Sequence, residues 1–460
     1  MTIKFTNNAS TTLASGITNS ATSLTVSSGA GALFPTIAGS DIFYVTLANT
    51  SGTVEIVKVT ARSSDTFTIV RAQDNTSAVA WNTGDKVELR PTAGVLNAFV
   101  QQDPAAPSTF GFKNRIINGA MMIDQRNAGA SVTTPTTSSF IYTLDRWNYY
   151  VTQGSKFTVQ QNAGSVTPPI GFSNYLGVTS TSAYSVVSGD LFSLNQPIEG
   201  FNTADLAWGT ANAKTVTLSF WVYSSLTGTF GGSILNNAYN RSYPFTYTVS
   251  SANTWTQISI TIAGDTTGTW VGATNGVGLR INFSLGTGST YSGTAGSWSG
   301  SQYWSATGAT SVVGTSGATF YITGVQLEKG STATSFDYRP YGTELMLCQR
   351  YYEQSYDIGT VAGTASTNAS ANYVYVSGPT GFTGGAFGIS FKVTKRAIPT
   401  LTAYSPTTGA SGKMYSFANA SDYSVTLSGQ QGTNSFGIYW AQASSNNVNG
   451  AVQWTAYSEL

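Results

Sequence analysis

Histidine is absent from the 460-residue sequence, and cysteine occurs once. The commonest general base and metal ligand is therefore missing, which excludes Ser-His-Asp catalysis, Cys-His catalysis and histidine-ligated zinc. A single cysteine allows no internal disulfide and no cysteine-rich metal site. Because no histidine can activate Cys348, we expect it to be a small buried residue and not a nucleophile. The sequence predicts no catalytic residues, no metal and no cofactor.

Charge is also scarce. Charged residues make up 9% of the chain, and the formal net charge is +1 with no basic run, so no nucleic-acid partner is expected. No stretch approaches the roughly 18 apolar residues of a membrane span, and no membrane insertion is expected. The first residues, MTIKFTNNAST, lack the apolar core of a secretory signal. This composition does not favour an enzyme.

Aromatic residues and short alternating runs are abundant instead. Phe, Trp and Tyr form 13% of the sequence, and small polar residues separate many β-rich runs. The pattern indicates an all-β protein, and roughly 150 residues per domain suggests about three domains. We predict a small N-terminal β-barrel or sandwich (1–90), a linker or short helical stem (91–113), a central two-sheet jelly roll (114–341), and a short helix followed by a C-terminal β-sandwich (342–460).

The N-terminal module shows a period of two in TVEIVKVTAR, which is typical of a strand. Its aspartates Asp65, Asp74 and Asp85 fall in turns. We interpret them as acceptors for nearby backbone amides, with metal binding as the alternative.

The segment 91–113 shows a helical pattern in place of the strand alternation that precedes it. Val95, Leu96 and Phe99 have helical spacing between two prolines. A helix of about ten residues is marginal alone and would gain stability by packing against copies of itself in neighbouring chains. Two interpretations stay open, a trimer stem and a flexible linker.

The middle domain combines regular strands with one low-complexity loop. In TVTLSFWVYS, residues Val216, Leu218, Phe220 and Val222 share one face, and eight or more such strands fit a jelly roll whose first and last segments lie adjacent. The aromatic residues Trp298, Tyr303 and Trp304 are embedded in the Gly/Ser/Thr-rich loop 286–317. They either stack on sugar rings or fold back over the sheet edge.

Charges concentrate in 320–353, where an apolar strand passes through a Pro-containing corner into a helical pattern, expected over 343–354. We interpret this stretch, including the Glu328–Arg339 region, as a joint between domains. The pair Asp145 and Arg146 is either a ligand-binding ion pair or a structural one, with the arginine stacked on a ring and the aspartate bonding backbone. Asp124, Gln125 and Arg126 are interpreted in the same structural way.

The C-terminal domain returns to strands and ends on QWTAYSEL, so the terminus is expected to be tied down. Its cationic pair Lys395–Arg396 either meets an anionic glycan or phosphate, or is a solvated strand end. The predicted glycan-binding residues are Trp298, Tyr303, Trp304, Tyr404, Tyr423 and Trp440.

Several motifs carry a resemblance to a known family. INGAMMIDQRN, YTLDRW and GVQLEKGSTATSFDYRPYGTEL followed by CQRYYE look like the carbohydrate-binding-module-like jelly roll of phage tail fibres and receptor-binding proteins. TLASGITNSATSLTVSSGAGALFP resembles the tail-attachment module of such proteins, and FKVTKRAIPTLTAYSPTTG their distal, receptor-facing domain. The resemblance implies a virion protein of the phage tail that docks on tail or baseplate proteins.

The same resemblance implies a homotrimer that adsorbs to host-surface polysaccharide or lipopolysaccharide without catalysis. Two alternatives stay open: a structural tail component with no receptor contact, and a polysaccharide-depolymerising tailspike. The second needs only a pair of carboxylates, but the 20 acidic residues are scattered and no β-helix repeat is visible.

Overall fold

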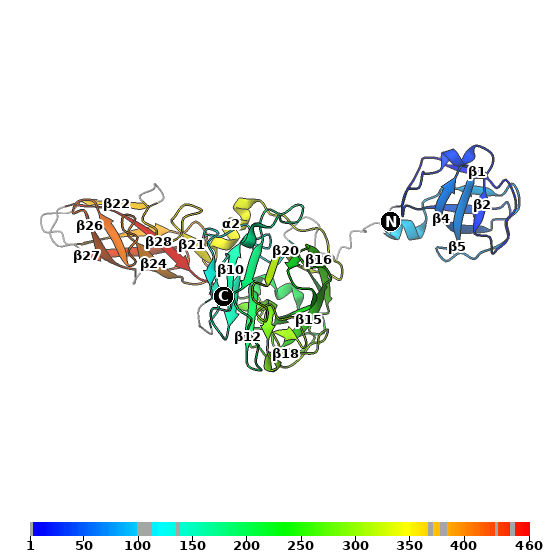
Figure 1. Ribbon diagram of the computed structural model, residues 1–460. Helices are drawn as coiled ribbons and strands as arrows, with labels where there is room; N and C mark the ends of the chain where they lie inside the picture. The colour runs from blue at the N-terminus through cyan, green and yellow to red at the C-terminus, as the bar shows by residue number, and fades with distance from the viewer. Residues whose placement is uncertain are drawn as a thin grey trace. The chain divides into compact units, whose positions relative to one another are not determined.

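The computed structural model describes residues 3–98, 113–134, 139–366, 371–377, 384–427, 431–441 and 447–460. The chain divides into two compact units, Met1–Thr109 and Phe110–Leu460 (Figure 1). Both consist of β-strands with few helices, so the predicted all-β class is confirmed. Within the described ranges, no helix is long and apolar enough to cross a membrane.

The first unit is a six-stranded antiparallel sheet that closes into a small barrel. The barrel closes because the two edge strands are hydrogen-bonded to each other at their C-terminal ends. The Ala14 N–H donates to the Thr25 carbonyl and the Ser27 N–H to that of Thr12, both at 2.9 Å. Phe43, at the centre of the sheet, is fully buried in the core. The strand order is β1 (Ser10–Thr12), β6 (Lys86–Glu88), β3 (Phe43–Ala48), β4 (Val54–Ser63), β5 (Thr66–Gln73) and β2 (Ser23–Thr25).

The turn aspartates of this unit bond backbone amides, as predicted. Asp65, Asp74 and Asp85 accept hydrogen bonds of 2.7–2.9 Å from N–H groups of Gly29 and Gly31, Gly94, and Asn82, respectively. Asp85 bonds an amide of its own turn, whereas Asp65 and Asp74 link their turns to amides 34–36 and 20 residues away.

The bond from Gly94 to Asp74 holds the short helix α1 (Ala93–Ala98) to the barrel, and Val95 is buried. Leu96 is half-exposed, at 49%. Phe99 and most of the predicted stem lie outside the described residues, so the trimer stem stays a prediction.

Glu55 is a carboxylate buried inside the first unit. It forms an ion pair with Arg71 (Nη2 to Oε2, 2.6 Å), accepts a hydrogen bond from Trp81 Nε1 at 2.9 Å, and accepts backbone N–H groups of Ala72 and Val79. Burial raises the pKa of Glu55, but the bonds from Arg71 and Trp81 outweigh burial, and the pKa lies below its ordinary value of 4.5. The ionised form therefore stabilises the fold.

We expect Glu55→Gln to lower the melting temperature of the first unit most at neutral pH. The unfolded chain binds a proton at a higher pH than the folded unit does, so the stability from Glu55 is present above about pH 4.5 and is lost as the pH falls through the folded-state pKa. The difference in melting temperature between wild type and variant should therefore shrink on acidification. Calorimetry of residues 1–109 measures it. A pH-independent difference, or an equal effect of the surface variant Glu88→Gln, would contradict this assignment.

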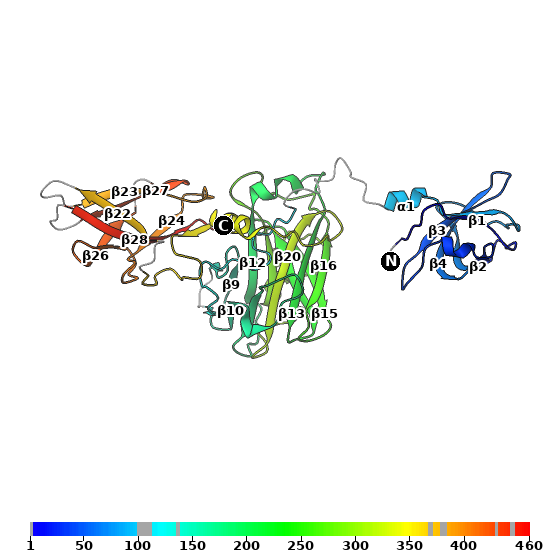
Figure 2. The same ribbon diagram turned by 90° about the horizontal axis from the view of Figure 1, so that it is seen from above.

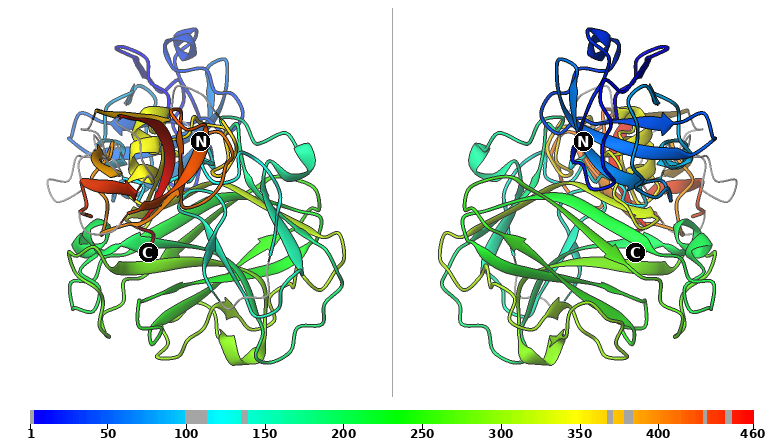
Figure 3. Two further views of the ribbon diagram at one scale, coloured as in Figure 1. Left: turned by 90° about the vertical axis from the view of Figure 1, so that its left-hand side faces the viewer. Right: turned by 90° about the vertical axis from the view of Figure 1, so that its right-hand side faces the viewer.

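The second unit begins with a jelly roll of two facing sheets (Figure 3). The alternation predicted for Val216, Leu218, Phe220 and Val222 is confirmed, since all four lie in the core between the sheets. The first sheet has the order β16 (Thr256–Ile262), β13 (Val216–Ser224), β20 (Thr319–Lys329), β11 (Leu176–Ser180), β10 (Phe157–Gln161) and β7 (Val132–Thr133). The second has the order β15 (Ser242–Val249), β14 (Gly228–Leu235), β17 (Val277–Thr287), β12 (Leu191–Glu199), β9 (Asn148–Val151) and β8 (Ile141–Tyr142).

The two ends of the jelly roll lie side by side, as predicted. The Arg115 N–H donates to the Leu327 carbonyl, and the Val325 N–H donates to the Gly119 carbonyl, both at 3.0 Å. A side chain at Gly119 would not fit, because its Cβ would lie 2.2 Å from the Val325 oxygen. This contact explains the glycine of the INGAMMIDQRN motif.

The joint follows directly after β20. The helix predicted over 343–354 is α2, Tyr341–Gln349, so both predicted bounds were wrong. The helix ends early because the next residues enter β21 (Tyr352–Gln354), which pairs with the last strand of the chain. Cys348 is fully buried, as predicted, and burial raises the pKa of its thiol. The Arg339–Glu344 ion pair (Nη1 to Oε2, 3.3 Å) ties the corner to α2.

The distal domain is organised around the last strand, β28 (Asn447–Tyr457), which pairs with β21 and is drawn in red in Figure 2. Its core includes Phe436, Trp440 and Trp454. The predicted tying-down of the terminus is confirmed, because the Tyr142 hydroxyl donates to the Leu460 carbonyl at 2.8 Å. The other strands are β22 (Asn372–Ser377), β23 (Gly384–Ser390), β24 (Thr400–Tyr404), β25 (Lys413–Ser416), β26 (Ser421–Thr426) and β27 (Ser435–Ala441).

Asp145 and Arg146 take the structural role. The Asp145 carboxylate accepts two bonds of 2.7 Å from the backbone and side-chain amides of Gln125, and burial raises its pKa to about 6. The Arg146 guanidinium stacks 3.6 Å from the centre of the Tyr351 ring and pairs with Glu459. The two neighbours thus bind different partners.

The pair Lys395–Arg396 is neither a solvated strand end nor an open anion site. Lys395 is 1% exposed, and its Nζ forms an ion pair with Glu353 at 2.5 Å. Arg396 donates to the carbonyls of Ser458 and Glu459 at 2.8 and 2.7 Å. Both expectations were wrong because each cation has a partner in a distant segment, which sequence spacing does not reveal.

Candidate functional site: an aromatic pocket on the outer face of the jelly roll

The outer face of the second sheet carries a row of polar residues. Strand alternation sends Ile281 and Phe283 of β17 into the core, so Asn282 points to the opposite face. Register pairs Asn282 with Asn195 of β12 and Ser233 of β14, and Asn195 with Asn148 of β9. The polar row is defined as these four residues: Asn148, Asn195, Asn282 and Ser233.

A loop covers this row, so that all four side chains are buried. The loop contains the short parallel pair β18 (Ser292–Gly293) and β19 (Ser305–Ala306). It is held to the sheet where Asn282 Nδ2 donates to the Trp304 carbonyl. Contacts with the sheet therefore hold this low-complexity loop in position, although it has no hydrophobic core of its own.

Beside the polar row, aromatic rings enclose a cavity of about 120 Å³, called here the aromatic pocket. Trp304 is its centre, with ring centroids 6.1 Å from Tyr150 and 5.5 Å from Tyr239, both stacked. The remaining lining residues are Phe140, Thr152, Leu191, Tyr291 and Gln302.

Arg280 adds a buried cation behind these rings. Its guanidinium carbon lies 4.2 Å from the centre of the Phe140 ring and 5.9 Å from that of Tyr239. The residue is 4% exposed, and its Nη1 has no hydrogen-bond partner among the described residues. Cation–π contact alone offsets only part of the cost of burying this charge.

Other buried polar atoms here also lack partners in the described part of the chain. They are Trp304 Nε1, Asn282 Oδ1, Ser233 Oγ and both side-chain amide atoms of Asn148. A buried donor or acceptor left unsatisfied costs about 1–3 kcal/mol. Of these five atoms, Trp304 Nε1 belongs to a residue that lines the aromatic pocket, and the other four lie beneath the loop, where they suit buried water. The described residues hold no cluster of three His, Cys, Asp or Glu side chains that could bind a metal.

The six predicted glycan-binding residues do not come together. Trp304 lines the aromatic pocket but is only 2% exposed and packs in a small core cluster with Leu191 and Leu235, as expected of a residue that folds back over the sheet. Trp298 instead packs edge-on against Trp208 and Trp270, at 5.2 and 5.4 Å, and its Nε1 donates to the Ala263 carbonyl. The ring of Tyr303 lies against Gly293.

The other three belong to the distal domain. Trp440 is buried in its core at 5% exposure, Tyr423 packs against that core, and Tyr404 contacts Tyr356 edge-on at 6.1 Å. A ligand-binding role for these three stays a prediction.

Sequence reasoning missed most of the pocket. Phe140, Tyr150, Tyr239 and Arg280 come from other strands and loops than Trp304, and only the fold brings them together. The available signals were Tyr291, which shares the low-complexity loop with Trp304, and an arginine within the strand pattern VGLRINFSLG.

No family model matches the chain, and no curated protein matches it. Among solved structures, it is similar to the enzymatically active domain of tailspike protein 4 of bacteriophage CBA120, at 15% identity and a TM-score of 0.26, over 47% of this chain and 22% of that one. It is also similar to the family 11 carbohydrate-binding module of Clostridium thermocellum in complex with a mixed-linked tetrasaccharide (11% identity, TM-score 0.22, 45% and 98% covered). A third is the N-terminal cellulose-binding domain of Cellulomonas fimi β-1,4-glucanase C (15% identity, TM-score 0.18, 35% and 80% covered). TM-scores this low carry no argument about function.

Proposed function

We propose that this jelly roll binds a saccharide of the host surface in the aromatic pocket. The observation that supports this is the set of buried polar atoms without partners beside stacked aromatic rings. Aromatic faces pack against the apolar faces of sugar rings, and the Gln302 amide and the Trp304 indole N–H, which belong to the lining, bond to the hydroxyls. The buried guanidinium of Arg280 favours a sugar unit with a carboxylate or phosphate.

The wider role that we propose is that of a phage tail fibre in the virion. The first unit attaches to tail or baseplate proteins, and the jelly roll and distal domain mediate adsorption without catalysis. The motif resemblance supports this role, since it spans all three regions in the same order.

Adsorption is tested with labelled full-length chain on host cells and on an array of bacterial polysaccharides and lipopolysaccharides. Binding to an acidic glycan, with weaker binding after its carboxylates are reduced to alcohols, supports the proposal. No decoration of cells and no array signal would leave the structural tail component as the better account.

The depolymerase alternative needs two carboxylates in one cavity. Asp337 and Glu344 form such a pair, but Glu344 is tied by its ion pair to Arg339. Glu353 and Asp357 together line another cavity at the joint, but Glu353 is tied by its ion pair to Lys395. An assay for new reducing ends, on the glycan that the array identifies, separates binding from hydrolysis.

We further propose that the chain is a homotrimer. Fibres hide sheet edges and apolar faces in shared interfaces, and α2 leaves Tyr341 and Met346 exposed at 42% and 52%. Native mass spectrometry should therefore give three times the 48.3 kDa of one chain. A stable monomer at micromolar concentration would contradict the trimer and leave the saccharide site untouched.

A further inference from the structure

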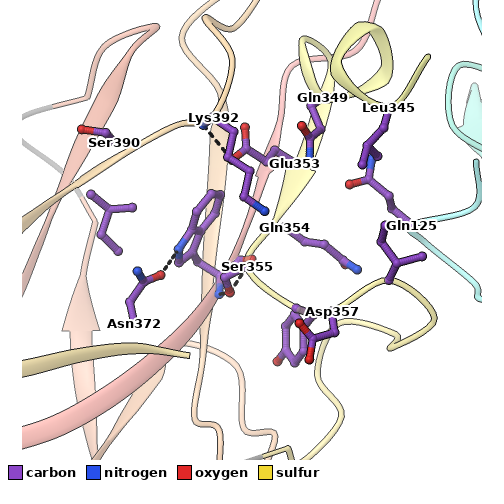
Figure 4. A pocket seen from close by; sticks show the side chains of 14 residues that line it. Gln125, Leu345, Gln349, Glu353, Gln354, Ser355, Asp357, Asn372, Ser390 and Lys392 are labelled. Carbon is purple, nitrogen blue, oxygen red and sulfur yellow. Dashed lines mark hydrogen bonds between the residues drawn. The ribbon is translucent and has the colours of Figure 1, made fainter. Parts of the chain in front are cut away.

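A second cavity, of about 520 Å³, lies at the joint between the jelly roll and the distal domain (Figure 4). Gln125 comes from the jelly roll, Leu345 and Gln349 from α2, and Asn372 and Ser390 from the distal strands. Its size is within the roughly 300–1,000 Å³ of small-molecule sites. The rest of the lining consists of Glu353, Gln354, Ser355, Tyr356, Asp357, Ile358, Ile389, Lys392 and Trp454.

The buried charge of this joint cavity is compensated. The Glu353 carboxylate, fully buried, accepts the Lys392 backbone N–H at 3.0 Å and pairs with Lys395 Nζ at 2.5 Å. Asp357 and the Lys392 side chain, which have opposite charges, are exposed at its rim. The interior therefore offers no unpaired cation or anion among the described residues, which disfavours an ionic ligand.

The interior of the joint cavity does contain uncharged side chains that can form hydrogen bonds. Gln349 is 5% exposed, lines the cavity, and its side-chain amide has no hydrogen-bond partner within the described residues. Gln125 is 4% exposed and uses its Nε2 on Asp145 and the Tyr352 carbonyl, while its Oε1 stays free. These amide atoms can therefore bond to water or to a polar ligand in the cavity.

Aromatic and aliphatic residues also line the joint cavity. Trp454 is fixed there because its Nε1 donates to Asn372 Oδ1 at 2.6 Å, which leaves the Asn372 amide nitrogen available. Tyr356 and Ile389 belong to the same lining. A lining that combines neutral amides with aromatic and aliphatic groups matches the hydroxyls and the apolar C–H groups of a sugar.

We propose that the joint cavity is a second saccharide-binding site, specific for an uncharged sugar unit. Its ligand contacts residues of both domains at once. A ligand of this kind stabilises their docked arrangement, because it binds the folded joint and not the separated domains. The site is independent of the aromatic pocket, whose lining shares no residue with it.

The test uses the full chain labelled with 5-fluorotryptophan and observed by fluorine NMR, with the Trp454 and Trp304 signals assigned through tryptophan-to-phenylalanine variants. Glucose, galactose and N-acetylglucosamine are the neutral probes, and glucuronate is the charged comparator. We expect at least one neutral sugar to move the Trp454 signal and to raise the melting temperature of the second unit. Glucuronate should do so more weakly.

Gln349→Met keeps the side-chain length and removes the amide, so it should weaken the Trp454 response about three- to tenfold. Gln302→Met makes the same change in the aromatic pocket, and Gln257→Met makes it on an exposed strand; both should leave the Trp454 response unchanged. A Trp454 signal that no neutral sugar moves, or an unchanged affinity in folded Gln349→Met, overturns the proposal. If only the Trp304 signal responds, the joint site is refuted and the proposed function stands.

Discussion

Replacing Glu459 by glutamine is expected to destabilise the second unit by about 3–5 kcal/mol, the usual cost of removing one partner from a buried ion pair. The Glu459 side chain is 1% exposed and lies between two arginines. It pairs with Arg126 (Nη2 to Oε1, 2.8 Å) and with Arg146. Both guanidiniums would be left buried with no carboxylate in contact.

Contacts with tyrosine rings hold both arginine side chains in the interior of the joint. Arg126 lies 3.9 Å from the centre of the Tyr352 ring, and Arg146 is stacked on Tyr351 while its Nη2 donates to the Pro197 carbonyl at 2.6 Å. The loss of stability therefore weakens the joint, where the C-terminal residues hold the jelly roll to the distal domain.

Thermal unfolding followed by circular dichroism measures this effect. Glu459→Gln should lower the melting temperature of the second unit. The jelly roll and the distal domain should then unfold in two separate transitions. Asp205→Asn is the matched control, because the Asp205 side chain is 53% exposed and its pair with Arg115 should contribute less than about 1 kcal/mol. Equal, small effects of both variants would contradict the role assigned to Glu459.

Removing the ring of Tyr239 should abolish most glycan binding. Tyr239 stacks on Trp304 and contacts Arg280, so it forms a wall of the aromatic pocket while being only partly buried. An aromatic residue at the centre of a binding site commonly contributes about 2 kcal/mol, which corresponds to roughly a thirtyfold loss of affinity. Titration calorimetry with the glycan found on the array measures this loss.

Tyr338→Ala serves as the control for this experiment. Tyr338 is an exposed aromatic of the jelly roll, at 55%, that packs against Phe172 and Phe336 and not against the pocket. It should bind the glycan as wild type does. Loss of affinity in Tyr338→Ala, or its retention in Tyr239→Ala, would place the site elsewhere.

Local patterns in the sequence predicted the local structure well. Period-two alternation placed the core face of β13, and the turn aspartates found the backbone partners expected of them. Of the two roles left open for Asp145 and Arg146, the structural one holds, and the motifs that flank them contact each other: Trp147 Nε1 donates to the Asn118 carbonyl and Asn118 Nδ2 to that of Asp145.

Contacts between distant segments were beyond local reasoning. Arg146 and Glu459 are 313 residues apart, and Lys395 finds Glu353 across 42 residues. Spacing carries no information about such pairs, so Lys395–Arg396 was misread as a surface feature. The helix end was misplaced for the same reason, since pairing with β28 draws Tyr352 into a strand.

The candidate site was predicted in one residue only. Trp304 stood out as an aromatic in a polar loop, but its neighbours Tyr150 and Tyr239 lie on other segments of the jelly roll. Whether an aromatic side chain is available to a ligand depends on which polar atoms find partners after folding. Trp298 Nε1 has one and Trp304 Nε1 lacks one among the described residues, a difference that sequence does not encode locally.

The most direct measurement is a crystal structure of the full chain with an acidic oligosaccharide of the host glycan bound. The account predicts a sugar ring against the Trp304 and Tyr239 rings, with a sugar oxygen within hydrogen-bond distance of Trp304 Nε1 and the acidic group toward Arg280. An oligosaccharide bound only on the distal domain, with the aromatic pocket holding water alone, would contradict it.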